Sequence, residues 1–255
     1  MRALVRDPRA RRDAGAFVLE GPRVVASALD HRAIVDTVYL APAAERAFAP
    51  LLDRVRAAGV RVADLKEGVL DRVGSTVTPQ PIVAVAPMRT SPLGELAPDG
   101  FVVVLVSIQD PGNAGTLLRS AEGSGAAGVV FCGDSVDAHN PKVVRSSAGA
   151  IFGTSLVEGD DPVKVLETLG AAGRQRLGTT ATGGVAPEML DLTVPLAFVL
   201  GNEAQGLAPE IGDELDGTIT IPLAVPKVES LNVAMAGTVL CFEAARQRRG
   251  RGSSA

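Results

Sequence analysis

Three polar segments in the second half of the chain combine glycines with side chains that bind anions or polar ligands. Residues 109–119 read QDPGNAGTLLR, residues 200–207 read LGNEAQGL, and residues 221–234 read IPLAVPKVESLNVA. In the first segment, Asn113 is suited to cap a following helix. Arg119 comes nearly two turns later and offers a planar guanidinium that can hold a phosphate through two hydrogen bonds. A structural ion pair with Glu122 or Glu203 explains Arg119 equally well.

The second and third segments are individually less informative. Gly201 and Gly206 allow a sharp turn or the close approach of a ligand to the backbone. Their spacing is not G-x-G-x-x-G, so the dinucleotide-binding fingerprint is absent, and a plain turn remains the alternative. In the third segment, Ser230 or Asn232 can cap the last helix, which would be a purely structural role.

The elements that must position these segments form an α/β pattern. A continuous β-branched and aromatic run at 101–106 indicates a strand buried on both faces. Further strands are predicted at 128–132, 177–181, 196–200 and 218–221, and helices at 162–169 and 230–248. We therefore predict a mainly parallel sheet with helices on both faces, and ligands gather at the carboxyl ends of strands in such sheets.

The first half of the chain predicts a smaller α/β unit. Its strands are expected at 17–20, 34–40, 60–62 and 82–85, and its helices at 21–30 and 42–59. Residues 87–94, PMRTSPLG, have the composition of a linker. We predict two domains, at 1–90 and 98–250.

Taken together, the three polar segments closely resemble the signature motifs of the SpoU (TrmH-like) family of the SPOUT RNA methyltransferases. Residues 140–150, NPKVVRSSAGA, match a further segment of that family. Residues 15–25, GAFVLEGPRVV, resemble the start of the RNA-binding, ribosomal-protein-like α/β domain often fused ahead of the catalytic domain. One departure is the loop after Pro222, which is one residue longer than usual and contains Val225, Pro226 and Lys227.

The resemblance implies a trefoil-knotted catalytic domain, a homodimer whose active site forms at the subunit interface, and S-adenosylmethionine as the cofactor. The implied reaction is methylation of a ribose 2′-hydroxyl of RNA. Residues expected near the cofactor are Leu200, Gly201, Asn202, Gly206, Ile221, Pro222 and Leu231. The sulfonium already activates the methyl group, so no metal is expected, and the two His and two Cys show no zinc-ligand spacing.

The same resemblance assigns the reaction to Asn113, Arg119, Glu203, Ser230 and Asn232. Arg119 is expected to bind the phosphate next to the target ribose and to draw proton density from the 2′-hydroxyl. Because a guanidinium keeps its proton in proteins, positioning and charge stabilisation describe its role better than general-base catalysis. The other four side chains are expected to frame the site by hydrogen bonds, with Glu203 also holding Arg119.

Charge is distributed unevenly, which suggests a polyanion as partner. The net charge is −4, but residues 1–90 carry 14 Lys and Arg against 10 Asp and Glu, whereas residues 91–245 carry 7 against 19. We predict that Arg9, Arg11, Arg12 and Arg145 contact RNA, although a solvated basic terminus without a partner explains the first three as well. Ribosomal 23S RNA is the favoured substrate. Transfer RNA, or a non-catalytic role in RNA binding or ribosome assembly, are the alternatives.

Nothing in the sequence points to a membrane or to export. No apolar run reaches the length that spans a bilayer, and the first residues, MRALVRDP, turn charged at once. Cys132 and Cys241 lie far apart and are expected to be reduced. A cytoplasmic enzyme is therefore expected.

Overall fold

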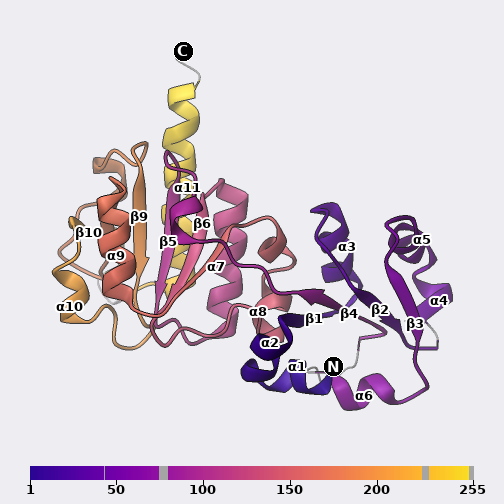
Figure 1. Cartoon of the computed structure of the whole chain (residues 1–255). Helices are drawn as coiled ribbons and strands as arrows, with labels where there is room; N and C mark the ends of the chain where they lie inside the picture. The colour runs from indigo at the N-terminus through magenta and orange to yellow at the C-terminus, as the bar shows by residue number, and fades with distance from the viewer. Residues whose placement is uncertain (43, 75–79, 226–229, 253–255) are drawn as a thin grey trace. The chain divides into compact units, whose positions relative to one another are not determined.

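The computed structural model describes residues 1–42, 44–74, 80–225 and 230–252 of the chain (Figure 1). Contacts divide it into two compact units, each described here by itself. The first contains residues 1–89 and 137–153, and the second contains residues 90–136 and 154–255. The return of residues 137–153 to the first unit differs from the contiguous division at 1–90 and 98–250 that the sequence suggested.

The first unit has a four-stranded sheet in the order β1-β4-β2-β3. Its strands are β1 (Ala16–Glu20), β2 (Thr37–Leu40), β3 (Arg61–Asp64) and β4 (Ile82–Pro87). Its helices are α1 (Arg2–Arg6), α2 (Pro8–Ala14), α3 (Pro22–Asp30), α4 (Ala44–Ala47), α5 (Ala49–Ala57), α6 (Val69–Val73) and α8 (Pro141–Ser146). Strands β2 and β3 pair in parallel, whereas β4 runs antiparallel to both of its neighbours.

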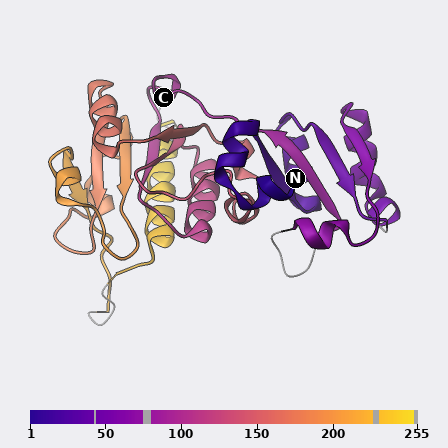
Figure 2. The same ribbon diagram turned by 60° about the horizontal axis from the view of Figure 1, so that its bottom comes forward.

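Helices cover both faces of this sheet, as Figures 1 and 2 show. On one face, Val18 of β1 and Val83 of β4 pack with Val5 of α1 and Leu70 of α6. On the other face, α3 packs against β1, β4 and α5. Helix α8 of the returning segment packs against β1, which explains why residues 137–153 belong to this unit.

The second unit has a six-stranded sheet in the order β10-β8-β9-β5-β6-β7. Its strands are β5 (Phe101–Val106), β6 (Gly128–Cys132), β7 (Leu156–Gly159), β8 (Gln175–Thr179), β9 (Leu196–Leu200) and β10 (Gly217–Ile219). Its α-helices are α7 (Pro111–Ser124), α9 (Pro162–Ala171), α10 (Pro209–Gly212) and α11 (Val233–Gly252). Neighbouring strands of this sheet pair in parallel, in agreement with the unbroken apolar runs in its sequence.

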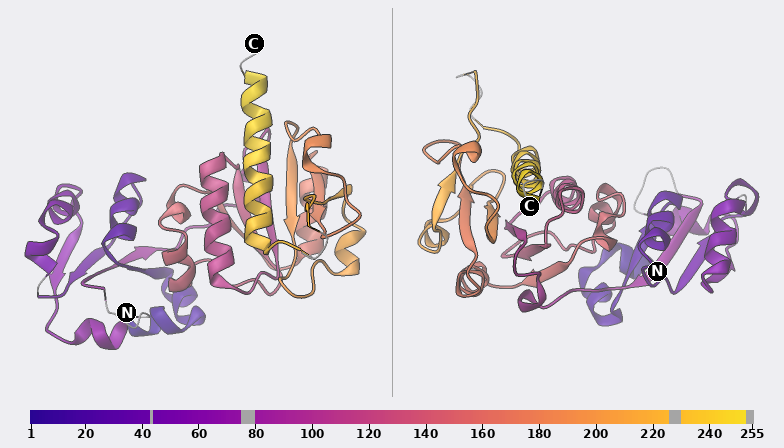
Figure 3. Two further views of the ribbon diagram at one scale, coloured as in Figure 1. Left: turned by 180° about the vertical axis from the view of Figure 1, so that it is seen from behind. Right: turned by 90° about the horizontal axis from the view of Figure 1, so that it is seen from above.

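The layers of the second unit follow from that composition. All six residues of β5 are buried, so both faces of the sheet need cover. Helices α7 and α11 lie side by side on one face, and α9 lies on the other, as the two opposed views in Figures 1 and 3 show. The hydroxyls of Ser120 on α7 and Thr238 on α11 hydrogen-bond at 2.7 Å, which fixes the two helices against each other.

Several predicted elements differ from the structure. The helix expected at 42–59 is two helices, α4 and α5, because Pro50 stands in the first turn of α5 and suits a helix start. Helices α1, α2 and α6 and strand β7 were not predicted. Their sequences are short and mix charged with apolar residues, so they carry little periodic signal. Across the described residues, no helix combines the length and apolar character needed to cross a bilayer.

Candidate active site

The first polar segment joins β5 to α7, and its geometry corrects one expectation. The cap of α7 is Asp110, whose carboxylate accepts a hydrogen bond from the Asn113 backbone N–H at 2.8 Å, with Pro111 in the first turn. Asn113 was predicted as the cap. Because Asp110 takes that role, the side chain of Asn113 is left available for contacts outside its own helix.

Glu203 connects the second segment to the first. Its carboxylate accepts hydrogen bonds from Gln109 N at 3.3 Å, from Asp110 N at 3.1 Å and from the Asn113 side-chain amide at 3.0 Å. Partial burial alone would raise the pKa of Glu203, but these hydrogen bonds, with that of Asn113 foremost, outweigh it and lower the pKa below the usual value. The site therefore holds Glu203 as a carboxylate at neutral pH.

Asn232 connects the third segment to the first. Its side-chain carbonyl accepts from Ala234 N at 2.9 Å and Met235 N at 3.3 Å, so Asn232 caps α11 and Ser230, the other capping candidate of the sequence, does not. Its amide donates to the Asn113 side-chain oxygen at 3.1 Å. Glu203, Asn113 and Asn232 thus form one hydrogen-bonded chain that joins the three polar segments.

The turn in the second segment depends on its two glycines and on Asn202. Asn202 and Gly206 exchange both backbone hydrogen bonds, and Gly206 has a φ of 71°. A Cβ on Gly201 would lie 2.4 Å from the carbonyl carbon of Gly206, so only glycine fits there. The Asn202 side chain donates to Ser107 O at 2.9 Å and so ties this turn to the end of β5.

A cleft of about 440 Å³ opens beside this turn, at the carboxyl ends of β8, β9 and β10. The residues that line it are Thr179, Thr180, Ala181, Gly201, Asn202, Glu203, Ala204, Gln205, Gly206, Ile219, Ile221, Leu223, Ser230, Leu231, Asn232, Val233, Ala236 and Leu240. The lining mixes backbone and amide groups with aliphatic side chains, which suits a ligand that has both polar and apolar parts.

Most residues expected near the cofactor lie at this cleft. Gly201, Asn202, Gly206, Ile221 and Leu231 line it, as do Glu203, Ser230 and Asn232 of the expected reaction set. The remaining two do not line the cleft, because Leu200 is fully buried in the sheet and Pro222 is exposed outside it. Of the longer loop, Val225 is exposed, whereas Pro226 and Lys227 lie outside the described residues.

One part of the lining was not predicted from the sequence. Thr179, Thr180 and Ala181 stand at the carboxyl end of β8. Applying the strand-end rule to the strand predicted at 177–181 would have found them.

Arg119 lies apart from the cleft lining. It is exposed on α7, six residues after Asn113, which corresponds to about 9 Å along the helix axis. Within the described part of the chain, Arg119 makes no hydrogen bond or ion pair. The expectation that Glu203 holds Arg119 is therefore wrong for this structure, because the carboxylate is occupied by Asn113 and two backbone N–H groups.

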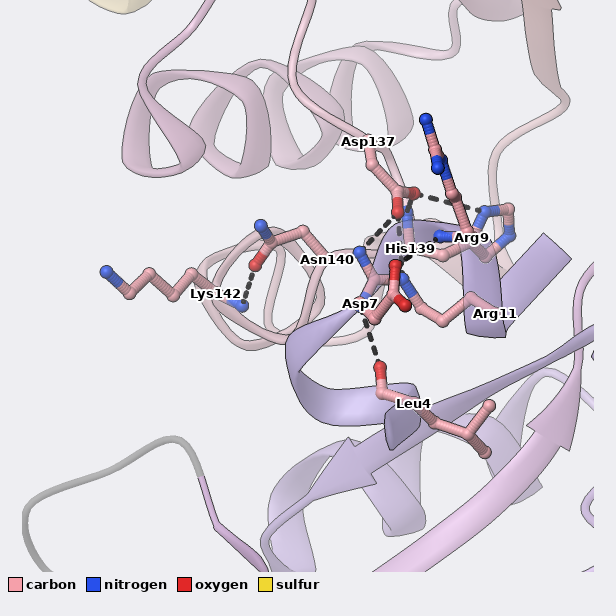
Figure 4. A network of polar contacts seen from close by, with 8 residues as sticks. All are labelled: Leu4, Asp7, Arg9, Arg11, Asp137, His139, Asn140 and Lys142. Carbon is pink, nitrogen blue, oxygen red and sulfur yellow. Dashed lines mark hydrogen bonds and ion pairs between the residues drawn. The ribbon is translucent and has the colours of Figure 1, made fainter. Parts of the chain in front are cut away.

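The residues predicted to contact RNA lie in the first unit and have different environments. Arg9 and Arg12 are exposed on α2. Arg11 is only 2% exposed, and its guanidinium donates to Asp137 and to Leu4 O (Figure 4). The prediction for Arg11 is corrected, because a buried, paired guanidinium is not available to a phosphate. Arg145 pairs at 3.1 Å with Glu20, whose side chain is buried.

The fold and the site define a parallel α/β domain with a ligand cleft at its strand ends, preceded by a smaller α/β domain. The model of the SpoU rRNA methylase family matches residues 100–242, and that of the MRM3-like substrate binding domain matches residues 1–84. This chain belongs to the SpoU rRNA methylase family.

Two relatives and a solved structure resemble the chain over nearly its whole length. The Bacillus subtilis 23S rRNA (guanosine(2553)-2′-O)-methyltransferase RlmP is 32% identical, over 91% of this chain and 89% of its own. The Streptomyces viridochromogenes 23S rRNA (uridine(2479)-2′-O)-methyltransferase is 32% identical, over 96% and 88%. The crystal structure of the SpoU methyltransferase AviRb from S. viridochromogenes in complex with AdoMet superposes with a TM-score of 0.83 at 30% identity, covering 97% and 96%.

Proposed function

We propose that this protein transfers a methyl group from S-adenosylmethionine to a ribose 2′-hydroxyl of 23S ribosomal RNA. The observation that carries the proposal is the hydrogen-bonded chain Glu203–Asn113–Asn232, whose first and last members line the cleft. Two relatives named for 23S rRNA 2′-O-methylation match both units of the chain, which favours ribosomal over transfer RNA.

The residues at the cleft fit S-adenosylmethionine. Ile219, Ile221 and Leu231 offer aliphatic surface for the adenine ring, and the turn at Gly201 and Gly206 lets a ligand approach the backbone closely. The cofactor, when bound, supplies a methyl group activated by a sulfonium. The Glu203 carboxylate adds negative charge to the cleft, which suits a cationic ligand.

The chain's own residues would then orient the RNA. The exposed guanidinium of Arg119 is suited to hold the phosphate beside the target ribose and to stabilise negative charge on the 2′-oxygen, whose proton would pass to solvent water. Asn113, fixed between Glu203 and Asn232, holds the first turn of the helix that carries Arg119. Arg9 and Arg12 are the exposed cations of α2 that we assign to RNA binding in the substrate-binding domain.

We further propose that the protein works as a homodimer in the cytoplasm, with a trefoil knot in its catalytic domain. Met235, Val239 and Phe242 of α11 are 60%, 44% and 46% exposed. Their spacing places them on one face of the helix, and an exposed apolar stripe of this kind suits burial against a second copy. Arg119 is not part of the cleft lining of its own chain, which is compatible with a site completed by two subunits.

The test is transfer from radiolabelled S-adenosylmethionine to protein-free RNA taken from a strain that lacks the gene. We expect label in 23S rRNA and not in transfer RNA, and no label with the Arg119→Ala variant. Label in transfer RNA alone would support that alternative substrate. Tight RNA binding without transfer to either RNA would support a non-catalytic role.

A further inference from the structure

The residues that lead from β5 into the first polar segment are held from several sides. Ser107 follows β5 directly and has a φ of 56°, a conformation that residues with a Cβ rarely adopt. Its backbone N–H donates to Cys132 O at 3.1 Å, and its carbonyl accepts from Asn202. A left-handed residue at this point requires that its neighbours fix it.

Each of the next three residues has its backbone N–H bound to a side chain from elsewhere in the chain. Gln109 and Asp110 donate to Glu203, as described above. Ile108, which is fully buried, donates instead to the hydroxyl of Ser135 at 3.1 Å. Ser135, which follows β6, therefore fixes the backbone N–H of Ile108.

The Ser135 hydroxyl contacts three backbone groups. It lies 2.9 Å from Leu105 O and 2.8 Å from Cys132 O, so it can donate to either strand end while it accepts from Ile108 N. A second bond runs in the opposite sense, since Asp134 N donates to the Ser107 hydroxyl at 3.3 Å. The residues after β6 and the residues after β5 thus hold each other in place.

We propose that Ser135 is a positioning residue for the methyl transfer, acting through Ile108 on Asp110, the cap of α7, and on Asn113 in the first turn of that helix. Ser135 is not among the residues that line the cleft, so it is not expected to touch the cofactor. Without its hydroxyl, Ile108 loses its acceptor and the left-handed turn at Ser107 loses one of its supports. Small displacements of groups that align reacting atoms reduce rates strongly. This inference rests on the methyl transfer proposed above.

The experiment compares Ser135→Ala, Ser135→Thr and the matched control Ser124→Ala in the full-length protein. Ser124 is also half-buried, and its hydroxyl also donates to two backbone carbonyls, but these belong to its own helix α7, and its further partner is Cys241 of α11, so none of its contacts reaches residues 107–110. Three quantities are measured for each protein. They are the single-turnover methyl-transfer rate, the calorimetric affinity for S-adenosylmethionine, and amide hydrogen exchange across residues 107–110.

For Ser135→Ala we expect a rate lower by about tenfold or more, faster exchange at 107–110, and unchanged cofactor affinity. Ser135→Thr restores the hydroxyl and should recover most of the rate, and Ser124→Ala should match the parent protein. A parent-like rate and exchange in Ser135→Ala would overturn the proposal. A parallel loss of cofactor affinity would overturn it too, because Ser135 would then support the whole sheet edge. If the parent protein transfers no methyl group, the proposed function fails, and the exchange comparison alone decides whether Ser135 holds the loop.

Discussion

The buried ion pair between Arg11 and Asp137 yields a quantitative prediction for the first unit. The side chains are 2% and 15% exposed, and Arg11 donates to Asp137 through Nε at 2.8 Å and through Nη2 at 2.5 Å. A third N–H of the guanidinium donates to Leu4 O at 2.7 Å. Removing one partner of such a pair leaves an uncompensated buried charge, which costs about 3–5 kcal/mol.

The informative variant is Asp137→Asn. Asn can still accept the hydrogen bond that Asp137 takes from His139 N at 2.8 Å, so the change mainly removes the charge opposite Arg11. We expect the free energy of unfolding of the first unit to fall by about 3–5 kcal/mol. The double variant Arg11→Met with Asp137→Asn should regain most of this loss, because no buried charge then remains. A double-mutant cycle isolates the coupling.

Hydrogen exchange of β1 and β4 amides under increasing denaturant reads the first unit separately from the second. The control is Asp30→Asn, which breaks an ion pair with Arg54 in the same unit whose side chains are 63% and 48% exposed. That exposed pair should be worth no more than about 1 kcal/mol. A loss in Asp137→Asn no larger than that of the control would refute the reasoning, because Arg11 would then have to reach water.

Four further predictions concern the site and its partners. Arg119→Ala should abolish single-turnover transfer and leave the calorimetric affinity for S-adenosylmethionine unchanged; lost cofactor binding in a folded variant would contradict its assignment to RNA. Replacing Arg9 and Arg12 by Ala should make RNA affinity less sensitive to salt in filter binding. The slope of log affinity against log salt should fall by about 0.7–0.9 for each phosphate that the variant no longer neutralises. An unchanged slope would show that α2 does not contact RNA. Phe242→Glu should give a monomer in light scattering, and a stable dimer would move the interface elsewhere. The folded pKa of Glu203 lies below its unfolded value of 4.5. The stabilisation from the ionised carboxylate should therefore be complete above pH 4.5 and be lost as the pH falls through the folded pKa. Acid unfolding curves of the parent and of Glu203→Gln that coincide at all pH values would argue against this.

The sequence predicted the parallel sheet because its strands are short, unbroken apolar runs, and this signal does not depend on partners distant in the chain. It predicted the motif segments because strand ends collect polar residues and glycines. The cap assignment at Asn113 was wrong because Asp110, three residues earlier, is an equally good capping residue and is followed by a proline. Only the structure reveals that Asp110 caps α7 and that the Asn113 side chain bonds Glu203 and Asn232 instead.

Other features depend on contacts between residues far apart in sequence. Arg11 was predicted to be exposed like its neighbouring arginines. Its burial depends on the Asp137 carboxylate, 126 residues away. The pairing of Glu203 with Asn113 instead of Arg119 spans 90 residues. Local periodicity does not predict that residues 137–153 belong to the first unit, because in the sequence α8 comes between β6 and β7 of the second unit. The anchoring role of Ser135 is invisible in the sequence for the same reason.

The most direct test of the central claim is nucleoside mass spectrometry of 23S rRNA after incubation with the protein and S-adenosylmethionine. The proposed function predicts one new nucleoside whose extra methyl group lies on the ribose, and its absence when Arg119→Ala is used. A methyl group on the base, or no new methyl group while the protein still binds the cofactor, would contradict it.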